Sequence, residues 1–182
     1  MVGTILVALA VLGVIGLASF LRAKRIFARL EKEMAKAWQA VISAMDARIL
    51  ALEELLSALR GAGYAPEGTG KLQEALDILR KSKDDPRALA EADERVEMVL
   101  RGIYRALPRE REERVRKAQN RLATADEELD IFKNRYNELV LQWYELTRGF
   151  SYKLLARGKK KPEPFALPGE EKELARRHLS TL

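Results

Sequence analysis

The sequence predicts an all-α protein in which an N-terminal transmembrane helix continues into an antiparallel, up-and-down four-helix bundle with long, coiled-coil-like helices. Three observations indicate this fold. Residues 2–21 contain no charged side chain, apolar residues then recur at steps of three and four, and glycine or proline separates the resulting stretches. We expect a membrane anchor over residues 1–21, a helical-bundle domain over residues 22–157, and a basic, proline-containing tail over residues 158–182.

The membrane anchor is predicted from the stretch Val2–Leu21, which includes Leu9 and Gly13 and carries no charge. About 20 apolar residues in a helix cover a hydrocarbon core about 30 Å thick. A cleavable signal peptide is one alternative, since residues 16–18 resemble a weak cleavage site, but no basic residue precedes the apolar stretch. A buried core helix is the other alternative, although such helices rarely need an apolar stretch of this length.

The residues that flank the anchor predict its orientation. Arg22, Lys24 and Arg25 follow it directly, whereas no lysine or arginine precedes it. Cytoplasmic flanks of membrane helices carry an excess of lysine and arginine. We therefore expect a single-pass protein of the cell membrane, with its N-terminus outside and its bundle in the cytoplasm.

The composition limits the chemistry available to the chain. There is no cysteine, and the single histidine is His178. These two facts exclude disulfides and the cysteine and histidine ligand sets of zinc or iron–sulfur sites. The acidic residues of the fourth predicted helix alternate with basic ones, which is typical of solvated helix faces. Because no nucleophile can be paired with a base, we expect no catalytic residue, no metal, no cofactor, no small-molecule substrate and no enzymatic activity.

The first helix of the bundle is predicted to continue from the anchor to about Arg60, because neither proline nor glycine interrupts residues 22–60. Gly61 and Gly63, with Pro66 shortly after, are typical of a helix C-terminus. One apolar stripe follows the helix at steps of three and four. It consists of Phe27, Leu30, Met34, Trp38, Val41, Met45, Ile49, Leu52, Leu56 and Leu59.

The connection at residues 61–71 is rich in glycine and ends in a glycine followed by Lys71, as a phosphate-binding loop does. Such a loop needs a strand before it and a serine or threonine after its lysine. Here Leu72 follows Lys71, Ala65 stands where the first glycine is required, and no strand precedes the connection. The pattern therefore favours an ordinary loop between helices.

Two shorter helices are predicted next, over residues 67–82 and 86–107. Asp85 directly precedes Pro86, and an aspartate N-cap with proline at the first helical position is a strong start signal. Both helices have apolar residues at helical spacing, and Pro108 marks the boundary that follows. The two stripes consist of Leu72, Ala75, Leu76 and Leu79, and of Leu89, Ala92, Val96, Val99, Ile103 and Leu107.

The fourth helix is predicted as one long helix over residues 109–156. Its apolar stripe has a strict heptad spacing, which predicts left-handed supercoiling with partner helices. With a reversal at every connection, the four helices run up, down, up and down, and the fourth ends near the bilayer. The tail is predicted to be mostly irregular, with a short helix at about residues 170–179. The heptad stripe is Val115, Ala118, Leu122, Ala125, Leu129, Phe132, Tyr136, Leu139 and Trp143, and it continues through Phe150 and Leu154.

A set of residues in the fourth helix has the spacing Q-x-x-L-x-x-x-E-x-x-I-x-x-x-R-x-x-Y-N-x-x-V. The set consists of Gln119, Leu122, Asp126, Leu129, Lys133, Tyr136, Asn137 and Val140, with conservative replacements at positions 126, 129 and 133. Ala37 and Trp38 form an A-W pair, Arg48 follows in the same helix, and residues 161–165 read K-P-E-P-F. In these motifs and their order the chain resembles the LemA family of bacterial membrane proteins.

The resemblance covers nearly the whole chain but has departures. Residues 49–53 replace the family's H-D-L-I-P stretch, Ile42 replaces an aspartate, and Trp143 with Tyr144 replaces a second Y-N pair. The resemblance implies a divergent member with an α-helical bundle on an N-terminal anchor, the N-terminus outside and the bundle inside. It implies no agreed catalytic activity.

Three of the resembling positions have open alternatives. Asp126 lies beside the apolar stripe, where it is either exposed or paired with a buried cation. Tyr136 and Asn137 are either a packing and hydrogen-bonding pair or a ligand site, and the first is favoured.

A basic segment follows the heptad stripe. It contains Arg148, Lys153, Arg157, Lys159, Lys160 and Lys161, with no acidic residue among them, and Phe150, Tyr152 and Leu154 alternate with these cations. In the reversing topology this segment lies near Arg22, Lys24 and Arg25, where basic and aromatic side chains favour contact with anionic lipid or with a partner. A solvated linker is the alternative. No recognition helix or motif accompanies the charge, so we expect no nucleic-acid partner.

The sequence thus favours a non-enzymatic, membrane-anchored helical bundle. We expect it to scaffold or dock protein partners, or copies of itself, at the cytoplasmic face of the bacterial inner membrane. The alternative is a membrane-organising protein that binds anionic lipid through its basic end and assembles laterally. An envelope enzyme is a third hypothesis and would require a bound metal or ligand.

Overall fold

The computed structural model describes residues 2–170 and Leu174 of the 182-residue chain, with side-chain surroundings from residue 10 onward. Within these residues the protein is all-helical and has no strand, so the predicted all-α class is confirmed. The helices are α1 (Val2–Gly61), α2 (Pro66–Lys81), α3 (Pro86–Ala106), α4 (Glu113–Leu146) and α5 (Phe150–Leu155).

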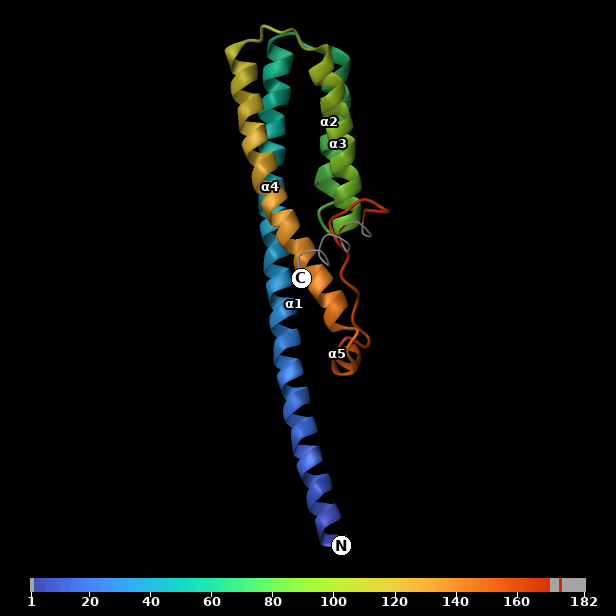
Figure 1. Cartoon of the computed structure of the whole chain (residues 1–182). Helices are drawn as coiled ribbons and strands as arrows, with labels where there is room; N and C mark the ends of the chain where they lie inside the picture. The colour runs from blue at the N-terminus through green and yellow to red at the C-terminus, as the bar shows by residue number, and fades with distance from the viewer. Residues whose placement is uncertain (1, 171–173, 175–182) are drawn as a thin grey trace.

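The first four helices run up, down, up and down, as predicted (Figure 1). α4 returns antiparallel along α1, and α2 and α3 form a shorter hairpin beside that pair. The most extensive pairings are α1 with α4 and α2 with α3, while α2 and α5 also contact α1. One apolar core contains side chains from all four long helices and therefore joins the two pairs.

The sequence signals at the helix ends act as predicted. Beyond α1, Gly63 has a φ of 68°, and the N–H of Tyr64 donates to the carbonyl of Leu59 at 2.9 Å. This arrangement is a Schellman cap, and its left-handed position suits glycine. At the start of α3, the Asp85 carboxylate accepts hydrogen bonds from the N–H groups of Arg87 at 2.9 Å and Ala88 at 3.0 Å.

The predicted fourth helix is shorter than expected and is divided. α4 begins at Glu113 rather than Arg109, and it ends at Leu146. Before it, the chain is extended at Glu112, with φ −55° and ψ 143°, and the acidic and basic residues 109–112 offer no apolar side chain to the core. After it, Gly149 is extended, with φ −73° and ψ 141°, and the chain restarts as α5. The heptad stripe therefore ends at Trp143.

The tail is irregular as predicted, but it packs against the bundle. Phe165 and Ala166 are buried, and Phe165 belongs to the main core. Most of the short helix predicted over residues 170–179 lies outside the described residues, as does His178. Within this range, the N–H of Leu174 donates to the carbonyl of Glu170 at 3.0 Å.

The predicted transmembrane part receives no support from the described residues. Among the residues whose side chains the structure describes, none belongs to a helical stretch both long and apolar enough to cross a membrane. Gly13 and Leu21 are among these residues. The side chains of residues 2–9, which include Val2 and Leu9, lie outside the described ones.

Candidate functional site

Arg48 joins three helices through its guanidinium group. The side chain extends from α1 and is only 2% exposed. Its Nε donates to Asp126 Oδ1 of α4 at 2.5 Å, and its two terminal nitrogens donate to Asp93 and Glu97 of α3. We call these four residues the Arg48 cluster. Of the two alternatives for Asp126, the structure shows the ion pair with a buried cation.

One cation faces three carboxylates in the Arg48 cluster. Burial lowers the pKa of Arg48, but Asp93, Asp126 and Glu97 together raise it above its ordinary value. Burial raises the pKa of Asp93 and the pKa of Glu97, and Arg48 opposes both increases without cancelling them. The attraction is strong because the surroundings are poorly solvated. This geometry holds α1, α3 and α4 together.

The tail runs antiparallel to α4, whose side chains bind its backbone. The N–H of Phe165 donates to Asn137 Oδ1 at 2.8 Å, and Asn137 Nδ2 donates to the carbonyl of Phe165 at 3.0 Å. The hydroxyl of Tyr136 donates to the carbonyl of Glu163 at 2.9 Å. Asn137 thus pairs with the tail as a neighbouring strand would, by one donor and one acceptor.

The same surface continues towards α5. The hydroxyl of Tyr144 donates to the carbonyl of Pro162 at 2.6 Å. Trp38 of α1 packs against Tyr136, with ring centroids 5.0 Å apart, and burial raises the pKa of Tyr136. We call the surface formed by Trp38, Tyr136, Asn137 and Tyr144 the tail groove. Tyr136 and Asn137 thus pack and form hydrogen bonds, and what they hold is the chain's own tail.

α5 packs against α1 at the lower end of the bundle. Phe27 of α1 lies between Trp143 and Tyr152, with ring-centroid distances of 6.1 and 6.3 Å. Lys159 Nζ lies 5.0 Å from the centroid of the Phe27 ring and is 2.5 Å from Glu31 Oε2. This contact brings the basic segment beside α1. Phe27 follows Leu21 by only about 9 Å along the helix.

The two predicted groups of cations therefore lie at the same end of the bundle (Figure 1). Arg22, Lys24 and Arg25 are exposed on α1, and five cations of the basic segment are exposed before, on and after α5. These five are Arg148, Lys153, Arg157, Lys160 and Lys161. Lys159 is also exposed, and it pairs with Glu31 and lies over the ring of Phe27.

The remaining resembling positions have structural roles. Val140 is fully buried in the main core, and Ala37 packs against that core. Gln119 accepts a hydrogen bond from Arg111 at 3.0 Å. Lys133 pairs with Asp130 at 3.1 Å, and its Nζ lies 5.6 Å from the ring centroid of Phe165. Lys133 thus covers the outer side of the buried tail residue.

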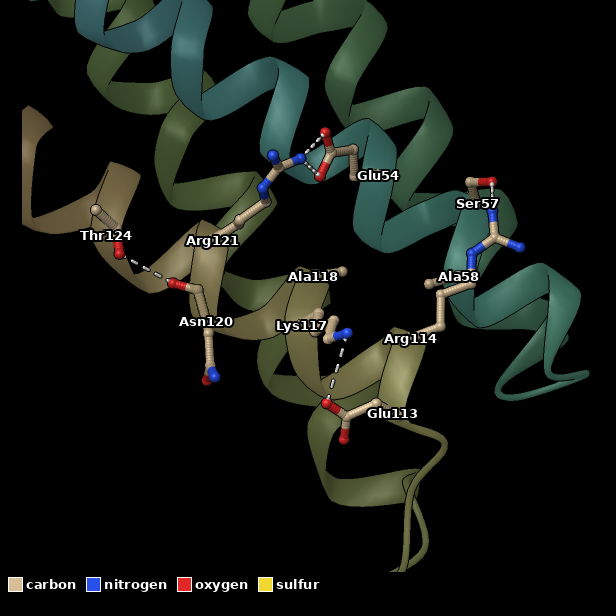
Figure 2. A pocket seen from close by; sticks show the side chains of 10 residues that line it. All are labelled: Glu54, Ser57, Ala58, Glu113, Arg114, Lys117, Ala118, Asn120, Arg121 and Thr124. Carbon is tan, nitrogen blue, oxygen red and sulfur yellow. Dashed lines mark hydrogen bonds and ion pairs between the residues drawn. The ribbon is translucent and has the colours of Figure 1, made fainter.

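A groove of about 900 Å³ lies between α1 and α4 at the opposite end of the bundle. Figure 2 shows that its charged side chains have partners. Arg121 binds both carboxylate oxygens of Glu54, Arg114 donates to Ser57 Oγ at 3.3 Å, and Lys117 pairs with Glu113 at 3.9 Å. None of the predicted functional residues lines this groove, and its paired charges indicate a solvated seam between helices.

Comparisons with family models, with curated proteins and with solved structures find no match to this chain. In residues 10–170 and Leu174, no group of three or more His, Asp or Glu side chains has an arrangement suited to a metal ion. In the same part of the chain, every buried side-chain nitrogen or oxygen has a hydrogen-bond partner. The polar groups of the Arg48 cluster and the tail groove are thus engaged within the protein.

Sequence reasoning missed several partners in these two sites. Asp93 and Glu97 were not expected to share a cation, although their spacing of four places them on one face of α3. Tyr144 and Phe165 were not expected to join the tail to α4. Phe165 itself was a usable signal. It is an aromatic residue in a basic, proline-containing tail, and large apolar side chains favour buried positions, so it suggests that the tail packs against the bundle.

Proposed function

We propose that the protein is a non-enzymatic, membrane-anchored helical bundle that scaffolds protein partners at the cytoplasmic face of a bacterial inner membrane. The observation that carries this proposal is the lower part of α1. Residues 10–19 are all exposed, and the exposed fractions of Leu12, Val14 and Leu17 are 64%, 68% and 61%. This part projects beyond the other described segments (Figure 1). A helix that is apolar on all sides is poorly suited to water and is typical of a membrane span.

The charges that follow support the proposed orientation. Exposed Arg22, Lys24 and Arg25 begin directly where the apolar stretch ends. The basic segment lies beside α1, where Lys159 pairs with Glu31, and it adds further cations near them. Both groups favour the cytoplasmic side, where anionic lipid attracts them.

The geometry of α1 supports a scaffolding role. The helix is continuous through Gly61, so the part after Leu21 extends about 60 Å from the proposed membrane surface. α4 lines most of this length and stiffens it through a heptad interface. Such a rod holds bound partners at a defined distance from the bilayer.

We also propose that the chain is a divergent member of the LemA family. In support, motif residues that are far apart in the sequence touch one another. Arg48 binds Asp126, and Asn137 binds Phe165 of the K-P-E-P-F segment. These contacts give the motif residues one structural role, which is to join segments that are distant in the sequence.

The anchor is tested by placing a charge in the exposed apolar stretch. Leu12→Arg puts arginine near the centre of the proposed span, where insertion costs about 2.5–3.5 kcal/mol. We expect much of this variant to leave the membrane fraction on alkaline carbonate extraction. Leu50→Arg is the matched control, because Leu50 is 62% exposed on the bundle and its replacement should leave membrane retention unchanged. Equal retention of both variants would contradict an anchor at this site.

Contact of the basic end with anionic lipid is a second candidate function. Phe150 is 86% exposed and Leu154 is 50% exposed, and both lie on α5 among exposed cations. Apolar side chains beside cations are the pattern of segments that lie in the headgroup region. The position of α5 beside Phe27 brings them close to the end of the proposed span.

Spin labelling of the cysteine-free chain tests this second function. A label on Lys153→Cys should approach the lipid in vesicles that contain phosphatidylglycerol, and it should withdraw in neutral vesicles or at high salt. A label on Lys117→Cys, at the far end of α4, is the control and should stay in solution in both. Identical lipid proximity of the two labels would rule out specific contact at the basic end.

A further inference from the structure

The tail groove recognises a backbone segment. Its hydrogen bonds go to backbone atoms of Pro162, Glu163 and Phe165, and the side chain of Phe165 fills one buried position. Grooves lined by aromatic residues bind extended, proline-containing segments in the same way in other proteins. Any segment of the sequence P-E-P-F-A that reaches the groove can make these contacts.

The connection that leads into the tail is exposed. Residues 157–161 have no helical structure, and Gly158 has a φ of 82°, which favours glycine. Fully extended, these residues span at most about 17 Å. Their side-chain contacts with α1 are made by Lys159, which pairs with Glu31 and lies over the ring of Phe27, and the two side chains of the ion pair are 44% and 30% exposed. Exposed ion pairs add little stability.

We propose that the tail groove also accepts residues 162–166 of a second copy of this chain, so that neighbouring molecules join by exchanging tails. The exchanged state makes the same contacts as the closed state and requires no new binding surface. This proposal deepens the scaffolding function, because it names another copy as the partner.

Anchoring favours the exchange for two reasons. Two copies inserted in one membrane stand parallel, so the tail of one starts at the same height as the groove of the other. Confinement to the membrane also raises the local concentration of grooves and favours binding between neighbours. The short reach of residues 157–161 requires that the two copies stand side by side, with their α5 helices close together.

Complementation between two full-length variants tests the proposal. Asn137→Ala disables the groove of one copy and keeps its tail, whereas Phe165→Ala disables the tail of the other copy and keeps its groove. In a mixture of the two, with different affinity tags, only the groove of the Phe165→Ala copy and the tail of the Asn137→Ala copy are both intact. We expect the two variants to co-purify severalfold more than differently tagged copies of either variant alone.

A second groove variant, mixed with Phe165→Ala in the same way, keeps the test valid if Asn137→Ala misfolds. Tyr136→Phe together with Tyr144→Phe removes two hydroxyl groups and keeps both rings, so it should replace Asn137→Ala as the partner of Phe165→Ala. The experiment is made in detergent and in vesicles, because co-purification in detergent does not depend on membrane insertion and so separates a failure of tail exchange from a failure of the anchor. Co-purification no higher than that of the single variants, with both groove variants and in both media, would overturn tail exchange.

Discussion

Arg48 is a charged side chain buried beside a core that consists mainly of apolar residues. Its three carboxylate partners lie at the surface side of the cluster, with side-chain exposures between 14% and 39%. The guanidinium group is therefore the part that loses its water, and the carboxylates replace that water. Loss of the Arg48 cation should therefore cost much more folding stability than loss of one partner of a surface ion pair.

Replacement of Arg48 by methionine should strongly destabilise the fold. Arg48→Met keeps a long side chain but leaves Asp93, Glu97 and Asp126 to repel one another near the core. Removing one partner of a buried ion pair costs about 3–5 kcal/mol, and we expect a loss of this size in the free energy of unfolding measured with urea. Arg121→Met is the control, since that arginine pairs with Glu54 at the surface and its loss should change stability little. Equal stability of both variants would contradict the role of Arg48.

The pH dependence of stability should report the raised pKa of Asp93. Burial raises this pKa despite Arg48, so the folded protein binds the proton more tightly than the unfolded chain does. The carboxyl group therefore adds stability as pH falls through its folded pKa towards its ordinary value of about 4. We expect the unfolding free energy of the wild type, minus that of Asp93→Asn, to rise between pH 7 and pH 4. A difference that falls with acidification would show the opposite shift.

At the scale of the elements, the helix ends and apolar stripes were predictable because their causes are local. Gly63 and Asp85 act through bonds to residues a few positions away. The end of α4 at Leu146 was not predictable in the same way, since the heptad spacing continues through Phe150 and Leu154. Beyond Leu146 the helix is interrupted, and α5 packs against α1 through the contact of Tyr152 with Phe27. Phe27 lies more than a hundred positions earlier in the sequence, so this contact leaves no local signal.

The tail groove illustrates the same limit at a site. Tyr136 and Asn137 could be selected from the resemblance, but their partners are backbone atoms of Glu163 and Phe165. Backbone donors and acceptors are the same at every residue, apart from proline, and so leave no trace in the side-chain pattern. For the Arg48 cluster, the sequence predicted that Asp126 could pair with a buried cation, but it did not predict that Arg48 is that cation.

Hydrogen exchange should show how firmly α4 holds the tail. Asn137→Ala removes the acceptor for the Phe165 amide and leaves a buried donor and acceptor unsatisfied, which costs about 1–3 kcal/mol. We expect the Phe165 amide to exchange much faster in this variant, while the core amides of α1 keep their protection. Asn134→Ala is the control, because Asn134 is exposed one turn away. Unchanged protection of Phe165 in Asn137→Ala would show that other contacts hold the tail.

At the scale of the whole molecule, the two ends of the bundle differ in character. The lower end combines the exposed apolar stretch of α1, exposed cations and α5, and the tail starts there (Figure 1). The upper end carries the groove of Figure 2, where Arg121 of α4 pairs with Glu54 of α1. This polarity fits a molecule with one end on a membrane and the other in solution.

Cysteine labelling in whole cells should reveal the side of the membrane on which the bundle lies. The chain has no cysteine, so a single introduced thiol reports one position. With the bundle in the cytoplasm, Lys117→Cys should react with a membrane-impermeant maleimide only after the cells are opened, whereas a cysteine inserted after Met1, ahead of the proposed span, should react in intact cells. The two variants control for one another, because both thiols must react in detergent. Labelling of Lys117→Cys in intact cells would reverse the orientation, and it would place the cations beside Leu21 on the outer face, against the usual bias of lysine and arginine.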